Sequence, residues 1–248
     1  MKLTNDVHVV GSGRLGFGIS GALDCHVYLI NGGGELALID TGMGLPGDFD
    51  QILTNLRDDG LDPKRIRKII LTHYHCDHIG AAKEAYARLD AEVIASRVAA
   101  PAIRSGDEQA VALDVAKAAN FYPQDYYLPP CPVEREVVEG DLITVGDYTL
   151  KVWDTPGHSD GHLSFTMQGS DRTYLIGADL VFWGGKIVLQ NIHDCRIDAY
   201  AQSVLKMAAL DFDALLPGHL QISLRGGKAH VEQAAAAFKQ LGVPPNLL

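Results

Sequence analysis

One short segment of this chain concentrates side chains that bind metals. Residues 71 to 80 read Leu-Thr-His-Tyr-His-Cys-Asp-His-Ile-Gly, with three imidazoles and one carboxylate within six positions: His73, His75, Asp77 and His78. Such groups are costly to bury unless they are paired or coordinated. The segment follows an apolar run that is typical of a buried strand. The pattern therefore indicates a metal site that takes further ligands from elsewhere in the chain.

The spacing within this segment favours two neighbouring metal positions. His73 and His75 lie two residues apart just after the predicted strand, and an extended backbone points both rings to the same side. Asp77 and His78 follow where the chain is expected to turn, so they can point toward a second position close by.

Three further candidate ligands come later in the chain, namely His158, Asp179 and His219. Each follows an apolar run that predicts a strand, and each has a glycine one or two residues before it. Glycine lets the backbone approach a site closely. Ligands at strand ends can also converge on one rim of a pair of packed sheets. Alone, His158 or His219 would more often be an ordinary histidine, but the ordered set favours a metal centre.

The other metal-capable residues are expected to have ordinary roles. We assign no metal role to His8, His26, His162, His193 and His230. Cys76 is expected to point away from the metals, because the candidate ligands flank it. Asp40 is expected to support a ligand or to form a turn rather than to bind a metal.

The elements that must position these residues alternate between short strands and helices. Strands are predicted at 7–10, 26–30, 36–39, 66–71, 92–95, 136–138, 142–145, 148–153, 163–167, 174–176 and 214–216. Helices are predicted at 49–58, 79–89, 97–120 with interruptions, 199–210 and 228–241, and the proline-rich segment 121–130 is predicted to be a loop. This order favours an α/β fold in which two sheets pack together with helices outside, a four-layer α/β/β/α sandwich. With no linker or repeat, one domain over 1–248 is expected.

The ligand pattern resembles the metallo-β-lactamase-fold hydrolases, in particular the glyoxalase-type and lactonase-type branches. The resemblance rests on the motif His-x-His-x-Asp-His at 73–78, on the three later ligands in the same order, and on the turn at 38–42. It implies a metallo-β-lactamase-type sandwich. One departure is Leu220, where many relatives have glycine, and it concerns the local backbone path.

Carried over to this chain, the resemblance implies a two-metal centre. The ligands of one ion would be His73, His75 and His158, those of the second Asp77, His78 and His219, and Asp179 would bridge the two ions. Zinc is the first expectation, while iron, manganese and cobalt fit the same ligand types. A hydroxide shared by the ions would be the nucleophile. It would form at neutral pH because the pKa of water falls to about 7 when the water is bound to zinc. Asp77 would orient that water or accept its proton.

The expected reaction is hydrolysis of a small acyl substrate: a lactone, a thioester or a related cyclic amide or ester, with β-lactam cleavage as a side activity. Glutathione thioesterases of this family carry an added helical region after the last histidine, whereas one helix is predicted after His219 here. We therefore do not expect a dedicated glutathione thioesterase. Two alternatives stay open: a mononuclear non-haem iron oxidoreductase of the persulfide dioxygenase type, and a phosphodiesterase. The residues do not decide whether Lys186, His193 or the segment 121–127 contacts substrate.

Composition restricts the partners. The net charge of −10 argues against nucleic acid and against anionic membranes as partners. The N-terminus lacks the apolar stretch of a secretory signal, and no window resembles a membrane span. Four cysteines without a Cys-x-x-Cys pair are typical of a cytoplasmic protein. We therefore expect a cytoplasmic enzyme with a small-molecule substrate, and a homodimer is compatible with the sequence.

Overall fold

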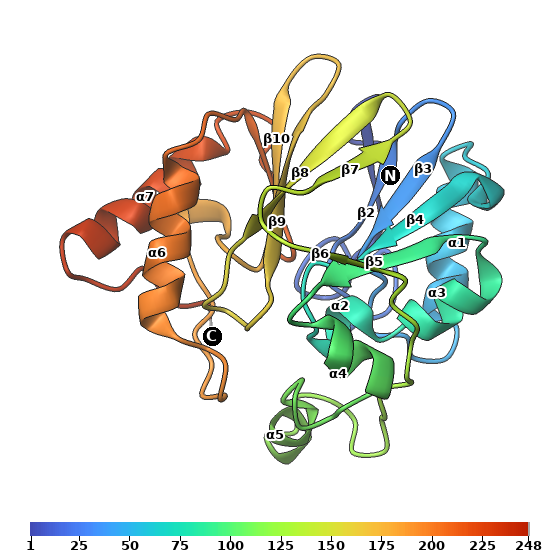
Figure 1. Ribbon diagram of the computed structural model, residues 1–248, viewed down its shortest axis with the longest axis horizontal. Helices are drawn as coiled ribbons and strands as arrows, with labels where there is room; N and C mark the ends of the chain where they lie inside the picture. The colour runs from blue at the N-terminus through green and yellow to red at the C-terminus, as the bar shows by residue number, and fades with distance from the viewer. Residues whose placement is uncertain (248) are drawn as a thin grey trace. The chain divides into compact units, whose positions relative to one another are not determined.

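The structure is a computed structural model that describes residues 1–247, and these form two compact units, one over Met1–Val137 and one that begins at Val138 (Figure 1). Each unit contains one β-sheet with helices packed on it. The two predicted sheets are thus present, one in each unit. The expectation of one domain over 1–248 stays a prediction.

The sheet of the first unit has six strands in chain order. They are β1 (Val7–Gly11), β2 (Val27–Asn31), β3 (Leu36–Ile39), β4 (Ile66–Ile70), β5 (Glu92–Ser96) and β6 (Arg135–Val137). The first three strands pair antiparallel, whereas β3 to β6 pair parallel. Since parallel strands end at the same edge of a sheet, Asp40, which follows β3, and the segment 71–80, which follows β4, begin at one edge.

Helices pack on this sheet and enclose the apolar core of the first unit. They are α1 (Asp48–Asp58), α2 (Cys76–Ile79), α3 (Ala82–Arg88), α4 (Ala100–Ser105) and α5 (Leu113–Ala118), with a 3₁₀ turn η1 at Pro63–Arg65. Helix α1 buries Phe49, Ile52, Leu53 and Leu56, which share one helical face and join the core of the sheet. Figure 1 shows α1 and α3 along one face of the sheet.

The helix predicted at 79–89 is wrong in its first part, because the chain forms two helices there. Helix α2 ends at Ile79 and α3 begins at Ala82. At Gly80 between them, a Cβ atom would overlap the carbonyl group of Met43 and the hydroxyl of Tyr126. Glycine is required here because it has no Cβ atom. The close approach brings together parts of the chain that are far apart in sequence.

The interrupted helix predicted at 97–120 consists of two short helices, α4 and α5. Pro101 lies in the first turn of α4, where the missing N–H costs no hydrogen bond. Gly106 has a φ of 64° and ends that helix in the left-handed conformation. Ala112 has a φ of 53° directly before α5. Because Gly106 and Ala112 both have a positive φ, one continuous right-handed helix does not form here.

The sheet of the second unit positions the three later candidate ligands. Its strands are β7 (Leu142–Val145), β8 (Tyr148–Asp154), β9 (Leu163–Gln168), β10 (Thr173–Ala178) and β11 (Ala214–Pro217), in the spatial order β11-β10-β9-β8-β7. Strands β7 to β10 form an antiparallel meander, and β11 pairs parallel with β10. Strands β8, β10 and β11 therefore run in the same direction and end at the same edge, just before His158, Asp179 and His219.

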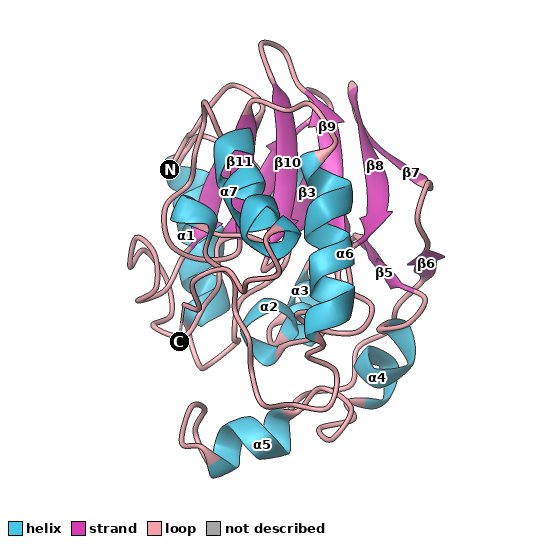
Figure 2. Cartoon of the chain, turned by 90° about the vertical axis from the view of Figure 1, so that its left-hand side faces the viewer, coloured by secondary structure: helices cyan, strands magenta, loops and turns pink. Residues whose placement is uncertain are grey.

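Two long helices complete the second unit, α6 (Ile197–Ala208) and α7 (Lys228–Lys239), with a 3₁₀ turn η2 at Trp183–Gly185. Figure 2 shows α6 and α7 side by side over one face of the sheet. Their buried side chains form one apolar cluster with Leu175 of β10 and Leu215 of β11. Every helix within residues 1–247 is too short or too polar to cross a bilayer.

Candidate metal centre

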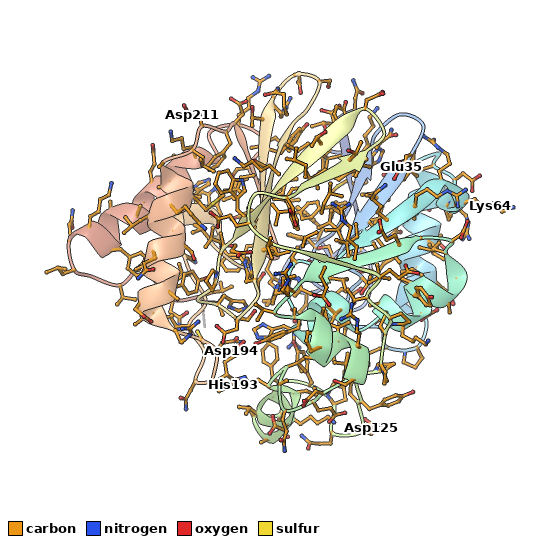
Figure 3. All side chains as sticks on the ribbon, in the orientation of Figure 1. Glu35, Lys64, Asp125, His193, Asp194 and Asp211 are labelled. Atoms are coloured by element: carbon orange, nitrogen blue, oxygen red, sulfur yellow. The ribbon has the colours of Figure 1, made fainter. Side chains whose placement is uncertain are left out.

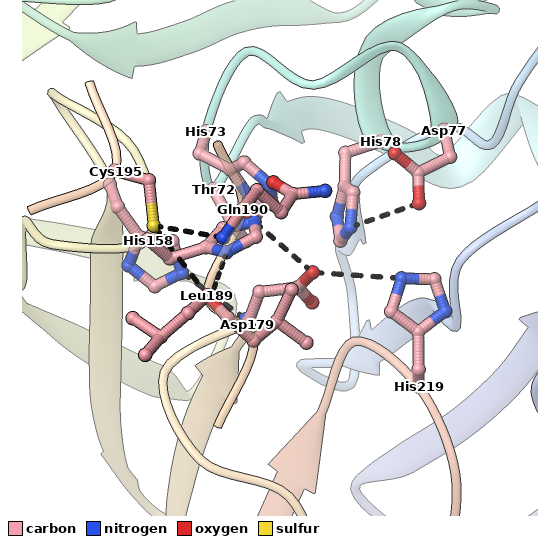
Figure 4. A network of polar contacts seen from close by, with 12 residues as sticks. Thr72, His73, Asp77, His78, His158, Asp179, Leu189, Gln190, Cys195 and His219 are labelled. Carbon is pink, nitrogen blue, oxygen red and sulfur yellow. Dashed lines mark hydrogen bonds and ion pairs between the residues drawn. The ribbon is translucent and has the colours of Figure 1, made fainter. Parts of the chain in front are cut away.

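The first unit brings together the four predicted ligands of the segment 71–80. His73, His75, Asp77 and His78 are all buried, with at most 8% of any of these residues exposed. The ring centroids of His73 and His75 are 4.8 Å apart, and those of His73 and His78 are 4.0 Å apart. Nε2 of His78 lies 3.6 Å from Oδ2 of Asp77 (Figure 4). Such a buried group of imidazoles and a carboxylate is typical of a metal site.

Asp40 supports this group, as predicted, through three hydrogen bonds. It follows β3 with a φ of 60°, a conformation that aspartate tolerates better than most residues. Its carboxylate accepts from the Thr72 backbone N–H at 2.8 Å, from the Thr72 hydroxyl at 2.8 Å and from Nδ1 of His78 at 2.8 Å. Because Nδ1 of His78 is held in this way, Nε2 is the atom that this ring can offer to a metal.

His73 is held in the same manner, with its Nδ1 3.0 Å from the hydroxyl oxygen of Thr72. A single residue pair, Asp40 and Thr72, thus fixes two of the imidazoles. A histidine that binds a metal through one ring nitrogen usually forms a hydrogen bond through the other, and this bond fixes the orientation of the ring. The residues of the first unit therefore fit a divalent metal by ligand type and by ring orientation.

Two buried cysteines, Cys25 and Cys76, belong to this part of the chain. The Cys25 sulfur, an Asp40 oxygen and a ring nitrogen of His78 lie within 4.8 Å of one another. The contact between Asp40 and His78 is the hydrogen bond described above, so this cluster belongs to the support of His78. Burial raises the pKa of both Cys25 and Cys76. Cys76 lies in the apolar core.

Asp24 connects the turn after Asp40 to the preceding loop. It accepts hydrogen bonds from the Ser20 hydroxyl at 2.5 Å and from the Met43 N–H at 2.8 Å. The side chain is buried. Burial raises the pKa of Asp24 from 3.8 to about 6, although these two hydrogen bonds act in the opposite direction.

Asp24 is expected to make the stability of the protein depend on pH between about pH 4 and 6. Because its pKa is higher in the folded state than in the unfolded chain, its contribution to the free energy of unfolding falls as the pH rises through this range. Over the whole range, the contribution of Asp24 to the free energy of unfolding changes by about 3 kcal/mol. The variant Asp24→Asn cannot ionise, so it should gain stability relative to the wild type as the pH rises from about 4 to 7. Urea denaturation at several pH values measures this, and parallel profiles for the two proteins would contradict it.

The second unit brings together His158, Asp179 and His219, all of them buried. Oδ2 of Asp179 lies 3.4 Å from Nε2 of His158 and 3.6 Å from Nε2 of His219. Figure 4 shows the contact with His219. A single carboxylate oxygen thus lies beside two imidazole nitrogens that come from different strand ends. This arrangement of imidazoles and a carboxylate is chemically suited to bind a divalent metal.

The backbone of Asp179 is fixed by two side chains. The Tyr200 hydroxyl donates to the Asp179 carbonyl at 2.6 Å, and the Asp179 N–H donates to Nε2 of His162 at 3.2 Å. Nδ1 of His162 is in turn 2.8 Å from the hydroxyl oxygen of Thr155. His158 has its Nδ1 3.3 Å from the Val188 carbonyl oxygen, so Nε2 is the atom that this ring could offer to a metal.

His162 is a supporting residue that the sequence analysis missed. Its role depends on the register of β9 and β10, in which Phe165 pairs with Ile176. Extended by three residues on each strand, this antiparallel register sets His162 opposite Asp179. A predicted hairpin with its register would have revealed the pair, because residues opposite each other on neighbouring strands interact.

Leu220 departs from the family pattern in residue type but not in backbone conformation. It has a φ of 65°, in the left-handed region that glycine adopts without strain. A branched side chain in this region costs about 1 kcal/mol. The chain therefore follows the path expected for glycine directly after His219. The ring of His219 packs 6.2 Å from that of Phe182.

Three of the remaining histidines form hydrogen bonds with other groups of the chain, and their exclusion from metal binding stays a prediction. His8 bonds to Asp59 at 2.7 Å, and His26 bonds to Ser12 at 3.0 Å. His230 accepts a hydrogen bond from the backbone N–H of residue 184 at 3.1 Å. His193 is exposed on the loop before α6 (Figure 3).

Comparison with known proteins gives a family match over most of the chain. The family model described as "Metallo-beta-lactamase superfamily" matches residues 20–219. An atrochrysone carboxyl ACP thioesterase from Aspergillus fumigatus is 25% identical over 194 residues, which cover 78% of this chain and 50% of that protein. An acyl-coenzyme A thioesterase from Gallus gallus is 26% identical over 79% of this chain and 73% of its own length.

A hydroxyacylglutathione hydrolase from Cereibacter sphaeroides is 27% identical, over 79% of this chain and 62% of that protein. The chain spans about half the length of the first curated relatives that it matches. Among solved structures, the subclass B3 metallo-β-lactamase of Bradyrhizobium japonicum has a TM-score of 0.72 at 24% identity, over 97% of this chain and 92% of that one. This likeness confirms the predicted α/β fold.

Proposed function

This chain belongs to the metallo-beta-lactamase superfamily, and from that premise we propose that its two groups of ligands form one dinuclear centre that hydrolyses a small acyl substrate. The family and the relatives indicate a hydrolase. The number of ions, the ligand set and the substrate are the parts that we add.

We assign the ligands to two ions. His73, His75 and His158 would hold the first, Asp77, His78 and His219 would hold the second, and Asp179 would serve both. The observation that carries this proposal is the position of Asp179 Oδ2 beside Nε2 of both His158 and His219. Because these two nitrogens are assigned to different ions, an oxygen close to both is one that the two ions could share.

The expected chemistry is attack of water on an acyl carbonyl. Divalent ions held by these residues would lower the pKa of water for attack at neutral pH and would polarise the carbonyl. Asp77 is the residue that orients the attacking water or accepts its proton, since its carboxylate lies at the metal-binding segment with one oxygen near His78. Zinc suits the ligand types best, and iron or manganese fits them too.

Thioesters are the first substrates to test. Two relatives are named thioesterases, for an acyl carrier protein and for acyl-coenzyme A, and a third is named hydroxyacylglutathione hydrolase. Lactones and related cyclic esters or amides also contain an acyl carbonyl that a nucleophile can attack. A small-molecule substrate, a cytoplasmic location and the lack of nucleic-acid and membrane partners stay predictions, as does a homodimer.

The test is a hydrolysis panel run on the protein together with metal quantification. The panel contains an acyl-coenzyme A thioester, a lactone, a β-lactam and a phosphodiester. We expect two metal ions per chain and the highest kcat/KM on the thioester or the lactone. One iron per chain with oxygen consumption would instead indicate the oxidoreductase, and activity confined to the phosphodiester would contradict acyl hydrolysis.

A further inference from the structure

Asp77 has a buried hydrogen-bond partner that lies far away in the sequence. The Tyr122 hydroxyl donates to Oδ1 of Asp77 at 2.7 Å. Both side chains belong to the first unit, and both residues are at most 9% exposed. A hydrogen bond to a carboxylate in such surroundings is stronger than the same bond in water.

The direction of this hydrogen bond follows from the two groups that form it. The Tyr122 hydroxyl carries a proton that it can donate to the Asp77 oxygen 2.7 Å away. An ionised carboxylate can only accept. Tyr122 is therefore the donor, and the bond holds Oδ1 in one orientation.

The two oxygens of Asp77 consequently face different groups. Oδ1 lies at Tyr122, whereas Oδ2 lies 3.6 Å from Nε2 of His78. Nε2 is the ligand atom of His78, because its Nδ1 is bonded to Asp40. Tyr122 thus fixes the rotation of the Asp77 carboxylate. In this rotation Oδ2 lies beside His78, which we assign to the same ion.

A second tyrosine of the same segment provides a matched comparison. The Tyr126 hydroxyl donates to the Met43 backbone carbonyl at 3.0 Å and does not bond to Asp77. Tyr126 is also buried, and it lies in the same apolar core as Tyr122. Both hydroxyls attach the segment 121–127 to the region around α2, but only Tyr122 contacts a metal ligand.

We propose that Tyr122 is a positioning residue for the second metal ion: its hydroxyl holds Oδ1 of Asp77 so that Oδ2 is the oxygen offered to the metal beside His78. This inference rests on the proposed dinuclear centre. It assigns a role to one member of the aromatic segment 121–127 that the sequence left without one. Removal of a hydrogen bond that orients a ligand typically weakens metal binding 10–100-fold.

The experiment compares Tyr122→Phe with Tyr126→Phe in the full chain. Each variant removes one buried hydroxyl and keeps the ring. Metal-free protein is titrated with Zn²⁺ against a chromogenic chelator, which gives the stoichiometry and the two dissociation constants, and with Co²⁺, whose visible spectrum reports the coordination of each ion. The thermal midpoint of each metal-free variant shows whether the fold is retained.

We expect Tyr122→Phe to weaken the second binding step by about 10–100-fold and to change the Co²⁺ spectrum at the second equivalent, with the first step unchanged. Tyr126→Phe should leave both steps within about 3-fold of the wild type, a margin well below the effect of losing a ligand's support. Unchanged binding in Tyr122→Phe, or an equal loss in both variants, would overturn the positioning role. Binding of only one ion by the wild-type protein would instead overturn the dinuclear centre itself.

Discussion

Replacement of Asp179 by alanine is expected to lower the metal content from two ions to one per chain and to reduce kcat/KM by at least about 100-fold. The reason is the shared contact of one carboxylate oxygen with the ligand nitrogens of His158 and His219. Without this oxygen, each of these positions loses a ligand. The residual ion is expected at the position that keeps three histidines, because imidazole binds zinc well.

The measurements are metal quantification after extensive dialysis and kcat/KM on the best substrate of the panel. Asp213→Ala is a suitable control, because Asp213 accepts a hydrogen bond from the N–H of Thr173 at the opposite end of β10. This variant should keep two ions and wild-type activity. If Asp179→Ala still held two ions at wild-type stoichiometry, the bridge would be wrong.

The second large effect is expected at Asp40, where two substitutions separate stability from metal binding. Asp40→Ala leaves three buried donors of Thr72 and His78 without their acceptor. The expected loss in the free energy of unfolding is about 3 kcal/mol or more, because each orphaned buried donor costs about 1–3 kcal/mol. The second ion should also bind at least about 10-fold more weakly.

Asp40→Asn should behave differently. An amide can still accept from the Thr72 N–H, but its N–H₂ group would donate to Nδ1 of His78. The proton of the ring would then move to Nε2, the atom that binds the metal. We therefore expect most of the stability to be kept and the second ion to be lost. Urea denaturation of the metal-free proteins and metal titration measure the two effects, and an asparagine variant with two tightly bound ions would refute this account of His78.

The sequence was sufficient to locate the strands, because short apolar runs between turn residues are read locally. The range predicted for β3 is the observed one, and those for β4, β7 and β8 differ by at most one residue. The supporting role of Asp40 could be predicted as well, since it follows a strand within a turn. The candidate ligands could be found because their residue types are unusual directly after buried strands.

Other features depend on contacts that a local pattern does not contain. The break between α2 and α3 lies at Gly80, which closely approaches Met43 and Tyr126, residues far away in the sequence. The hydrogen bond from Tyr122 to Asp77 spans 45 positions, and the predicted loop gave no direction for its side chains. His162 was overlooked for the same reason, because its partner Asp179 lies on a neighbouring strand.

The hydrogen bonds on Nδ1 of His73, His78 and His158 affect how metal binding relates to folding. In a zinc finger the ligands are unordered before the ion arrives, so most of the binding free energy is the folding free energy. Here the rings are oriented by the protein itself, and the loss of rotamer freedom, up to about 1–2 kcal/mol per side chain, occurs during folding. Ions of the proposed centre would therefore bind to a scaffold that is already ordered, so one metal could be exchanged for another without unfolding of the chain.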